Sequence, residues 1–317
     1  MSGSEVLLLG PRDVAALLDP AALVEALRGA FAAAARGEVE APPRSEIRLD
    51  GGGALLLMPG QQAGRDAMVK HVGLFPGNPA RGLPHHPATI CAFDAETGQL
   101  RAVLDATGLT AARTAAAAAL SVSLAARAGA RIAAVIGAGP VAAAHLAFLP
   151  AVCVLGELRV AGRRPDAVAA LASAHGARAV ATVEEAVRSA DVVCLCTSAS
   201  EPVVAPAWLA PGAHVTSVGY APPGGELDPA LARDGRLLVE TRAAFAPPPA
   251  GCAELAGLDP SAAAELGEVV LGERPGRASD DELTVYKSMG SVVEDLAAAE
   301  LVIRRAGELG AGRRVAF

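Results

Sequence analysis

The chain has 317 residues, with 27 basic and 34 acidic side chains and a formal net charge of −7 at pH 7. A hydrophobic share of 52% is enough for a large buried core, and a charged share of only 19% argues against a disordered chain. The acidic balance disfavours a nucleic-acid binder, because such proteins need a basic surface for the phosphates. The length suggests about two domains.

The five cysteines and the first residues of the chain indicate the compartment. The cysteine spacings match no zinc-site pattern, so we expect free thiols in a reducing cytoplasm and no metal site. No basic segment leads into an apolar one at the start, so we expect no signal peptide. In the alanine-rich middle, Arg113, Arg127 and Arg131 interrupt the ~18–20 apolar residues that a membrane span needs. A cytoplasmic protein with neither membrane nor nucleic acid as partner is expected.

The first hundred residues predict a mixed α+β region. Asp19 and Pro20 are typical of a helix N-cap followed by proline at the first helical position. Apolar residues at helical spacing continue from there, which predicts a helix over 21–36. Strand-like runs follow at 45–58 (with a glycine turn at 51–53), 68–74, 89–93 and 99–104.

After residue 110 the pattern becomes an alternation of helices and strands. An alanine-rich helix is predicted over 111–128, and the apolar run 131–136 is typical of a buried parallel strand. Further strands are predicted at 157–161, 192–196, 214–218 and 237–239, with helices at 165–175, 183–190 and 288–309. Such alternation implies right-handed βαβ crossovers, so the fold class is α/β with a doubly wound sheet.

A glycine-rich turn follows the first of these buried strands. Gly137, Gly139 and Ala142 fit the pattern G-x-G-x-x-A. The first glycine permits the tight turn, the second lets a pyrophosphate approach the backbone, and the small sixth residue lets the helix pack on the strand. The helix that begins here offers free N–H groups to the phosphates. We therefore expect a Rossmann-type dinucleotide site.

The end of the next strand indicates which nucleotide binds. NAD enzymes usually carry an acid there for the ribose hydroxyls. This chain instead has Arg163 and Arg164, which suit a 2′-phosphate. NADP(H) is therefore favoured over NAD(H); the alternative is two solvated arginines before a helix.

Four longer segments add to the pattern. They are Lys70 followed by F-P-G-N-P-A-R-G-L-P at 75–84, L-T-A-A-R-T-A-A at 109–116, D-E-L-T-V-Y-K-S-M-G at 281–290, and V-E-D at 293–295. Together with the glycine turn they resemble the ornithine cyclodeaminase/mu-crystallin family, over roughly residues 40 to 303.

The resemblance implies a homodimer of two-domain subunits. A substrate-binding and dimerisation domain is expected at 1–112 and 296–317, and an NAD(P)-binding Rossmann domain at 113–295. Members of the family include ornithine cyclodeaminases, alanine dehydrogenases, ketimine or Δ1-pyrroline-2-carboxylate reductases and mu-crystallins. Their substrates share the carboxylate of an α-amino or α-imino acid.

The resemblance also assigns three cations to that carboxylate. By position they are Arg44, Lys70 and Arg113. Guanidinium groups suit this role, because their paired donors match a carboxylate. Lys70 lies in an apolar setting that favours a shifted pKa and a part in proton transfer. Each of the three is alternatively an ordinary surface cation.

Five further positions are expected near the reacting groups. His86 matches a histidine of mu-crystallin-like members and is either a proton donor or polar contact to the substrate, or an ordinary loop histidine. Thr114, Thr197 and Ser288 are expected to border the cofactor. Glu294 either orients this end of the site through hydrogen bonds or lies on a helix surface.

One loop departs from the family. Cyclodeaminases and alanine dehydrogenases carry an acid there in a G-x-D-x-P-G-K type segment, whereas this chain has V-G-Y-A-P-P-G-G-E-L-D-P at 218–229. This chain has neither Asp nor Lys at those two positions. Asp228 does not replace the missing acid, because it aligns with a different acid that precedes the next helix. Ornithine cyclisation would lose the group that activates its amine or water, whereas imine reduction needs only a carboxylate clamp, hydride and a proton.

The sequence therefore predicts an NADPH-dependent reductase of a cyclic α-imino acid, such as Δ1-pyrroline-2-carboxylate or Δ1-piperideine-2-carboxylate. In this interpretation a cationic pocket of one domain holds the anionic substrate for hydride transfer from a nucleotide bound to the other. The alternatives are an ornithine cyclodeaminase or alanine-type amino-acid dehydrogenase with rearranged acids, or a non-catalytic NADP(H)-binding protein of mu-crystallin type.

Overall fold

The computed structural model describes residues 5–248 and 250–316, and the chain divides into two compact units. Unit 1 comprises residues 1–113 and 292–317, and unit 2 comprises residues 114–291. The sequence placed these divisions at 112/113 and 295/296. The structure therefore assigns both Arg113 and the first turn of the last helix, with Glu294, to unit 1.

Unit 1 is built on a mixed sheet. Its strand order is β16-β1-β7-β6-β5-β4-β2, with β3 also paired to β4, and every pairing is antiparallel except β1 with β7. The strands are β1 (Glu5–Leu9), β2 (Val39–Glu40), β3 (Ser45–Arg48), β4 (Ala54–Gln62), β5 (Ala67–Leu74), β6 (Ala88–Phe93), β7 (Leu100–Asp105) and β16 (Arg313–Ala316).

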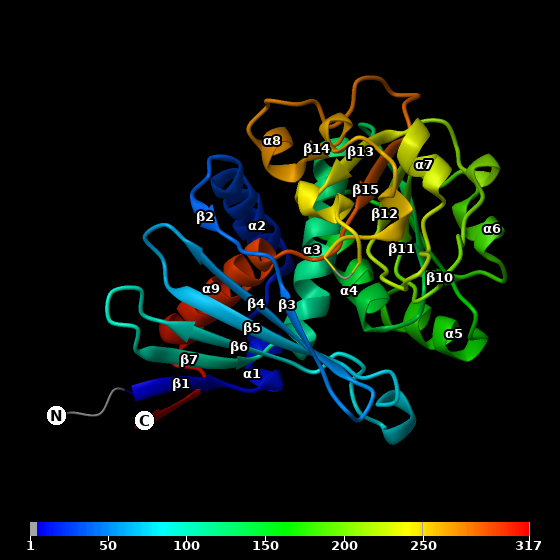
Figure 1. The fold of residues 1–317 in the computed structure, drawn as a ribbon. Coiled ribbons are helices and arrows are strands. Elements are labelled where there is room, and N and C mark those ends of the chain that lie inside the picture. The colour runs from blue at the N-terminus through cyan, green and yellow to red at the C-terminus, as the bar shows by residue number, and fades with distance from the viewer. Residues whose placement is uncertain (1–4, 249, 317) are drawn as a thin grey trace. The chain divides into compact units, whose positions relative to one another are not determined.

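Helices α1 (Pro11–Leu17), α2 (Pro20–Ala35) and α9 (Val292–Leu309) cover this sheet. Asp19 caps α2 by accepting a hydrogen bond from the N–H of Ala22, and Pro20 occupies the first position, as the sequence predicted. Helices α2 and α9 pack against one another and against β4 (Figure 1). The first turn of α9 is thereby buried in unit 1.

Unit 2 contains a wholly parallel sheet in the order β10-β9-β8-β11-β12-β15-β13-β14. The strands are β8 (Ile132–Ile136), β9 (Glu157–Ala161), β10 (Arg178–Ala179), β11 (Val192–Leu195), β12 (His214–Ser217), β13 (Arg236–Val239), β14 (Ala264–Glu265) and β15 (Thr284–Lys287). The chain adds β9 and β10 on one side of β8 and then β11 and β12 on the other. The predicted doubly wound α/β sheet is confirmed, with its topological switch point at β8.

Helices cover both faces of this sheet. They are α3 (Thr107–Ala125), α4 (Pro140–Phe148), α5 (Pro165–Ala174), α6 (Val183–Val187), α7 (Pro229–Asp234) and α8 (Leu266–Val270). Alternate residues of β8 face opposite sides: Ala133 and Val135 pack in a cluster with residues of α3, α4 and α5, and Ala134 and Ile136 in a cluster with residues of α6 and α7. Both layers consist mainly of small aliphatic side chains, which suits an aromatic content of 3%.

Contrary to the expectation from the interrupting arginines, helix α3, which contains Arg113, is long and apolar enough to span a membrane by length and composition alone. Within the protein, 72% of its apolar window is buried, which is the pattern of a core helix. The helix starts four residues before the predicted residue 111, and the side chain of Asp105 accepts a hydrogen bond from the N–H of Thr107 near this start. It carries Arg113 and then Thr114 across the division between the two units.

The sequence missed strand β15 and extended the last helix too far. It predicted a helix from residue 288, whereas the residues up to Lys287 form the strand between β12 and β13 and α9 begins only at Val292. The reason is Lys287, which reads as a surface charge but is fully buried and paired with Glu254.

Candidate functional site

The glycine turn between β8 and α4 has the backbone of a phosphate site. Gly137 has a φ of +136°, and a side-chain Cβ there would lie 2.5 Å from the carbonyl oxygen of Cys196. Gly139 is the N-cap of α4, and a Cβ added to it would meet nothing within 4 Å. Ala142 is fully buried against the sheet. The turn therefore leaves open space at the helix N-terminus, where a pyrophosphate fits.

Arg163 and Arg164 follow β9 beside this turn. Both are exposed, and Arg164 is the N-cap residue of α5. Its Nη2 atom lies 3.4 Å from the carbonyl oxygen of Ala138 within the glycine turn. A cation is thus held next to the expected ribose position, while the guanidinium still reaches solvent. This arrangement can receive a phosphate on the 2′-oxygen.

The carboxyl ends of β11 and β12 are joined by Glu226, a buried acid that the sequence reasoning did not single out. Its carboxylate accepts hydrogen bonds from both the N–H and the hydroxyl of Thr197, from the hydroxyl of Ser217, and from the N–H groups of Val218 and Gly219. Only 1% of Glu226 is exposed. It therefore fixes two turns at the sheet edge where doubly wound folds bind their ligands.

A buried lysine, Lys287, contacts the loop after β12 at this same edge of the sheet. Lys287, at the end of β15, donates hydrogen bonds to the carbonyl of Gly219 and to Glu254, both at 2.8 Å, and to the hydroxyl of Ser217 at 3.3 Å. The next residue, Ser288, is also buried. The loop after β12 is consequently held from both sides by buried charges.

The acids within residues 218–229 are both used in holding the structure. Glu226 is the bonded carboxylate just described, and Asp228 is the N-cap of α7, where it accepts a hydrogen bond from the N–H of Ala230 at 2.8 Å. Neither is placed as an open carboxylate for amine chemistry. The loop therefore does not replace the acid that the cyclodeaminase pattern carries.

Unit 1 contains a buried cluster of two cations and two acids. Lys70 on β5 donates to Oδ1 of Asp295 at 2.8 Å, and Nε of Arg113 on α3 donates to the same oxygen at 3.1 Å. Nη1 of Arg113 donates to Glu294 at 2.6 Å. The four side chains are at most 7% exposed. Both acids lie in the first turn of α9, where the helix dipole favours negative charge.

The electrostatics of this cluster give Lys70 a lowered pKa, which suits a proton donor near neutral pH. Burial and the charge of the nearby Arg113 lower the pKa of its ammonium, the charges of Asp295 and Glu294 oppose that change, and the net pKa is about 8. A lysine at this pKa is mostly protonated at pH 7 yet releases its proton more readily than an exposed lysine.

His86 is less suited to donate a proton. Partial desolvation by the surrounding atoms is the main cause that lowers the pKa of His86 to about 4, and the charges of His85 and Lys70 add to it. The side chain of His86 nevertheless remains exposed. The rings of His85 and His86 meet edge to face with centroids 4.2 Å apart. The imidazole of His86 is therefore neutral at pH 7 and serves best as a polar contact.

The predicted site residues thus fall into two groups. Lys70, Arg113 and Glu294 meet in unit 1, where the charge on Lys70 also affects His86, and Arg44 lies half-buried just before β3. The positions predicted for the cofactor lie in unit 2: Thr114, Gly137, Gly139, Ala142, Arg163, Arg164, Thr197 and Ser288. Sequence reasoning missed Asp295 and Glu226 as site residues, although V-E-D at 293–295 had marked the first of them as part of a motif.

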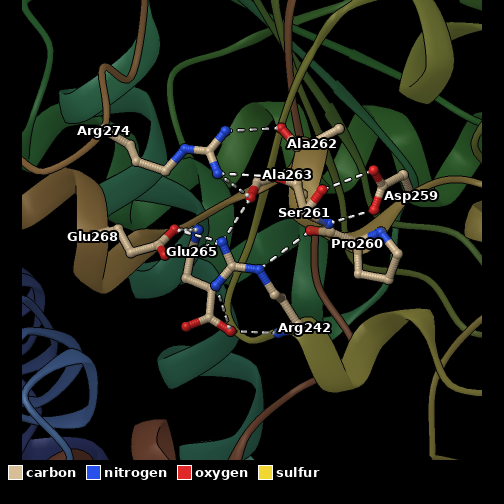
Figure 2. Close-up of polar contacts among 9 residues, drawn as sticks. All are labelled: Arg242, Asp259, Pro260, Ser261, Ala262, Ala263, Glu265, Glu268 and Arg274. Carbon is tan, nitrogen blue, oxygen red and sulfur yellow. Dashed lines mark hydrogen bonds and ion pairs between the residues drawn. The ribbon is translucent and has the colours of Figure 1, made fainter.

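A further dense polar cluster in unit 2 is structural (Figure 2). Arg242, which follows β13, donates to both oxygens of Glu268 and to two backbone carbonyls, while its own N–H donates to Glu265. Arg274 donates to the carbonyls of residues 261–263. These bonds fasten segment 259–268 to the end of the sheet. Within residues 5–248 and 250–316, no group of three or more His, Cys, Asp or Glu is placed to hold a metal.

Comparison with known proteins gives a consistent match. The sequence profile of the ornithine cyclodeaminase/mu-crystallin family matches residues 5–309. The chain is 37% identical over 254 residues to the ketimine reductase mu-crystallin of Mus musculus, covering 79% of this chain and 80% of that protein. It is 37% identical over 308 residues to a Δ1-pyrroline-2-carboxylate/Δ1-piperideine-2-carboxylate reductase of Azospirillum brasilense, covering 93% and 96%.

Solved structures agree with this match. The Δ1-pyrroline-2-carboxylate reductase of Thermococcus litoralis, in complex with NADH and L-proline, superposes with a TM-score of 0.89 at 30% identity, covering 98% of this chain and 100% of that one. An archaeal alanine dehydrogenase dimer with bound NAD gives a TM-score of 0.90 at 29% identity, covering 99% and 100%. The chain therefore belongs to the ornithine cyclodeaminase/mu-crystallin family and is an NAD(P)H-dependent oxidoreductase that acts on imine or CH–NH bonds.

Proposed function

We propose that this protein reduces a cyclic α-imino acid, such as Δ1-pyrroline-2-carboxylate or Δ1-piperideine-2-carboxylate, to the corresponding amino acid with NADPH. The observation that carries the proposal is the loop after β12. One of its acids, Glu226, is buried and accepts five hydrogen bonds, and the other, Asp228, caps a helix. Neither is therefore available to activate an amine or water. Relatives named for imine reduction support the same choice.

In the proposed mechanism the unit 1 cations bind the substrate carboxylate. Arg113 and Lys70 provide paired donors, with Arg44 as a third contact, and Asp295 and Glu294 hold the first two head groups in place. The bound nicotinamide cofactor supplies hydride to the C=N carbon. Lys70 supplies the proton to nitrogen, because its ammonium is protonated near pH 7 and has a lowered pKa, whereas the neutral His86 acts as a polar contact.

The proposal that NADPH is the cofactor rests on the glycine turn and on Arg163 and Arg164. The open space at Gly139 suits the pyrophosphate, and the two exposed arginines after β9 favour the 2′-phosphate of NADPH. Replacing both arginines by alanine is expected to raise the KM for NADPH by about 10–100-fold, the effect of one or two charge-assisted hydrogen bonds, and to leave the KM for NADH nearly unchanged. A wild-type protein that oxidises NADH faster than NADPH would contradict this assignment.

The assay that tests the substrate measures NADPH oxidation with the five- and six-membered cyclic imino acids. L-Ornithine and L-alanine with NADP+ are the comparisons, because relatives of this chain include alanine dehydrogenases. Fast turnover of a cyclic imino acid supports the proposal. Ammonia release from ornithine, or faster reduction of NADP+ by alanine, would replace it with the corresponding alternative, and tight NADPH binding without any turnover would indicate a carrier.

We further propose that the protein is a cytoplasmic homodimer. All five cysteines are free in the structure, which suits a reducing compartment. A dimer is seen in the archaeal alanine dehydrogenase of the same fold.

A further inference from the structure

The charged cluster of unit 1 centres on one oxygen atom. Oδ1 of Asp295 accepts hydrogen bonds from Nζ of Lys70 at 2.8 Å and from Nε of Arg113 at 3.1 Å. The other oxygen, Oδ2, is buried and has no hydrogen-bond partner among the described residues. A carboxylate with one oxygen shared by two cations is therefore committed to them alone, from the first turn of a helix that packs on the sheet.

We propose that Asp295 is the positioning residue of the reduction: its Oδ1 atom keeps the proton-donating Lys70 charged and aimed beside Arg113 until the proton is transferred. This inference rests on the proposed imine reductase function. It assigns no contact between Asp295 and the substrate. Asp295 acts through Lys70. It is not one of the carboxylate-binding positions that the family resemblance assigns.

The charges around Lys70 explain why such a residue is needed. Lys70 is 1% exposed, so water does not stabilise its ammonium, and Arg113 adds a second positive charge beside it. Asp295 and Glu294 on α9 balance these two cations, and the charge on Lys70 also affects His86. Without Asp295 the cluster carries an excess positive charge, which Lys70 relieves most readily by losing its proton.

The proton transfer balances as follows. As the C=N bond is reduced by the hydride that the bound cofactor supplies, its π electron pair forms the N–H bond with the proton that leaves Nζ of Lys70. Lys70 becomes a neutral amine, and water returns the proton. Asp295 takes no part in the transfer itself, and its charge favours the charged form of Lys70 before the transfer and again after it.

The test is the pH profile of kcat/KM in Asp295→Asn, with the same cyclic imino acid for every variant so that titration of the substrate cancels. Loss of the carboxylate is expected to move the alkaline limb from about pH 8 to lower pH by about 1–3 units. The loss of activity is therefore large at pH 8 and much smaller at pH 6. An equal loss at every pH, with the limb unmoved, would show that Asp295 is merely structural and would overturn the proposal.

Two variants on the same helix control for charge and position. Glu294→Gln removes an equally buried acid that bonds Arg113 and contributes least to the pKa of Lys70, so its limb moves less. A shift as large as that of Asp295→Asn would mean that only the net charge matters, against the proposal. Asp295→Glu keeps the charge one methylene away; we expect it to lower the rate and leave the limb near pH 8. It provides the comparison with wild type if Asp295→Asn does not fold.

A second measurement separates this inference from the proposed function. The folded-state pKa of Lys70 lies below its usual 10.5, so the folded protein binds fewer protons and stability rises with pH between about 8 and 10.5. In Asp295→Asn this rise begins at lower pH, and the melting temperature increases between pH 6 and 8 by more than in wild type. The added increase vanishes in the double variant Lys70→Met/Asp295→Asn.

The pH profile of kcat/KM and the melting temperature together distinguish failure of the proposed function from failure of the role given to Asp295. Wild type that reduces no cyclic imino acid, with the stability shift present, would refute the proposed function and leave the effect of Asp295 on Lys70 standing. Normal turnover with neither the pH limb nor the stability profile moved by Asp295→Asn would refute the role of Asp295.

Discussion

Arg113 and Lys70 are both buried cations, yet their side chains suit different tasks. The guanidinium of Arg113 is fixed from two directions, since Nε bonds Asp295 and Nη1 bonds Glu294. Lys70 has a single-point ammonium whose pKa burial lowers to about 8. A guanidinium stays charged in proteins, so Arg113 suits the proposed binding of a carboxylate, and of the two only Lys70 is able to release a proton.

For Arg113→Lys we expect a selective loss of substrate binding. An ammonium lacks the planar pair of donors, and losing about one charge-assisted hydrogen bond, worth about 1.5–3 kcal/mol, raises the KM for the imino acid by about 10–100-fold. The dissociation constant of NADPH, measured by fluorescence titration, should stay unchanged. Arg101→Lys is the matched control, because Arg101 makes exposed ion pairs with Asp66 and Asp94 on unit 1. Equal weakening of both ligands would contradict the assignment of Arg113.

The lowered pKa of Lys70 predicts how kcat/KM depends on pH. A donor must be protonated, so kcat/KM of the wild type should fall as the pH rises through about 8. Lys70→Arg keeps the charge, and arginine does not lose its proton, so we expect the rate to fall by about 10²–10⁴-fold and the alkaline limb to disappear. The measurement is initial rate against pH between 5.5 and 9.5. A variant that keeps most of its activity would assign the proton to His86 or to water.

At the scale of elements, the turn between β8 and α4 separates two roles of glycine. Gly137 needs its φ of +136° and the absence of a Cβ, because a methyl group would lie 2.5 Å from a backbone oxygen. Gly139 has ordinary extended backbone and open space where a Cβ would stand. The sequence motif already gave the two glycines these different roles, and the structure adds the close contact with Cys196 that explains the first of them.

We therefore expect two different outcomes from two alanine substitutions. Gly137→Ala forces the β8–α4 turn against Cys196, so it should lower the free energy of unfolding by about 1–3 kcal/mol and weaken NADPH binding. Gly139→Ala should fold with unchanged stability and lose affinity for NADPH only, since its methyl group projects where the pyrophosphate is proposed to bind. Urea unfolding and NADPH titration measure the two effects. Destabilisation by Gly139→Ala equal to that of Gly137→Ala would contradict this reading.

Patterns of period and turn chemistry were enough to predict the parallel sheet. The apolar run at β8, the glycine turn and the alternating helices all depend on local sequence, so they were visible without the structure. Strand β15 was not visible, because it ends in Lys287, whose partner Glu254 lies 33 residues earlier. Glu226 was likewise missed, since its donors come from two other strand ends.

The same limit applies to the site. The sequence and the family resemblance named the cations, Lys70 and Arg113, and listed Glu294 with two possible roles. They did not pair Lys70 with Asp295, because 225 residues separate the two and only the return of α9 to unit 1 brings them together. The apolar neighbours of Lys70 in the sequence predicted a shifted pKa, but the charges of Asp295 and Glu294 that oppose the effect of burial come from a distant part of the chain, so the sequence did not show them beside Lys70.

At the scale of the whole molecule, exposed apolar side chains bear on the proposed homodimer. Ile47 on β3 is 52% exposed and Leu83, in the loop after β5, is 52% exposed as well, both in unit 1. Contiguous exposed apolar patches are typical of surfaces that a partner covers, whereas single exposed apolar residues are ordinary, so the expected dimerisation role of this domain is what favours a contact here. The resemblance also assigned dimerisation to the domain formed by the N-terminal residues and the last helix. The exposed Ile47 makes β3 a candidate for the surface between two copies, which a charge at this position tests.

Wild type should therefore sediment with about twice the monomer mass of 31.6 kDa. Ile47→Asp places a charge on the proposed contact, where burying it without a partner is unfavourable, and should shift the equilibrium toward the monomer. Val154→Asp is the matched control: Val154 is 80% exposed but belongs to unit 2, so its variant should remain dimeric. Sedimentation velocity over a tenfold range of concentration measures the shift. A dimer that Ile47→Asp leaves intact would place the contact elsewhere on unit 1, and a wild-type monomer would refute the homodimer itself.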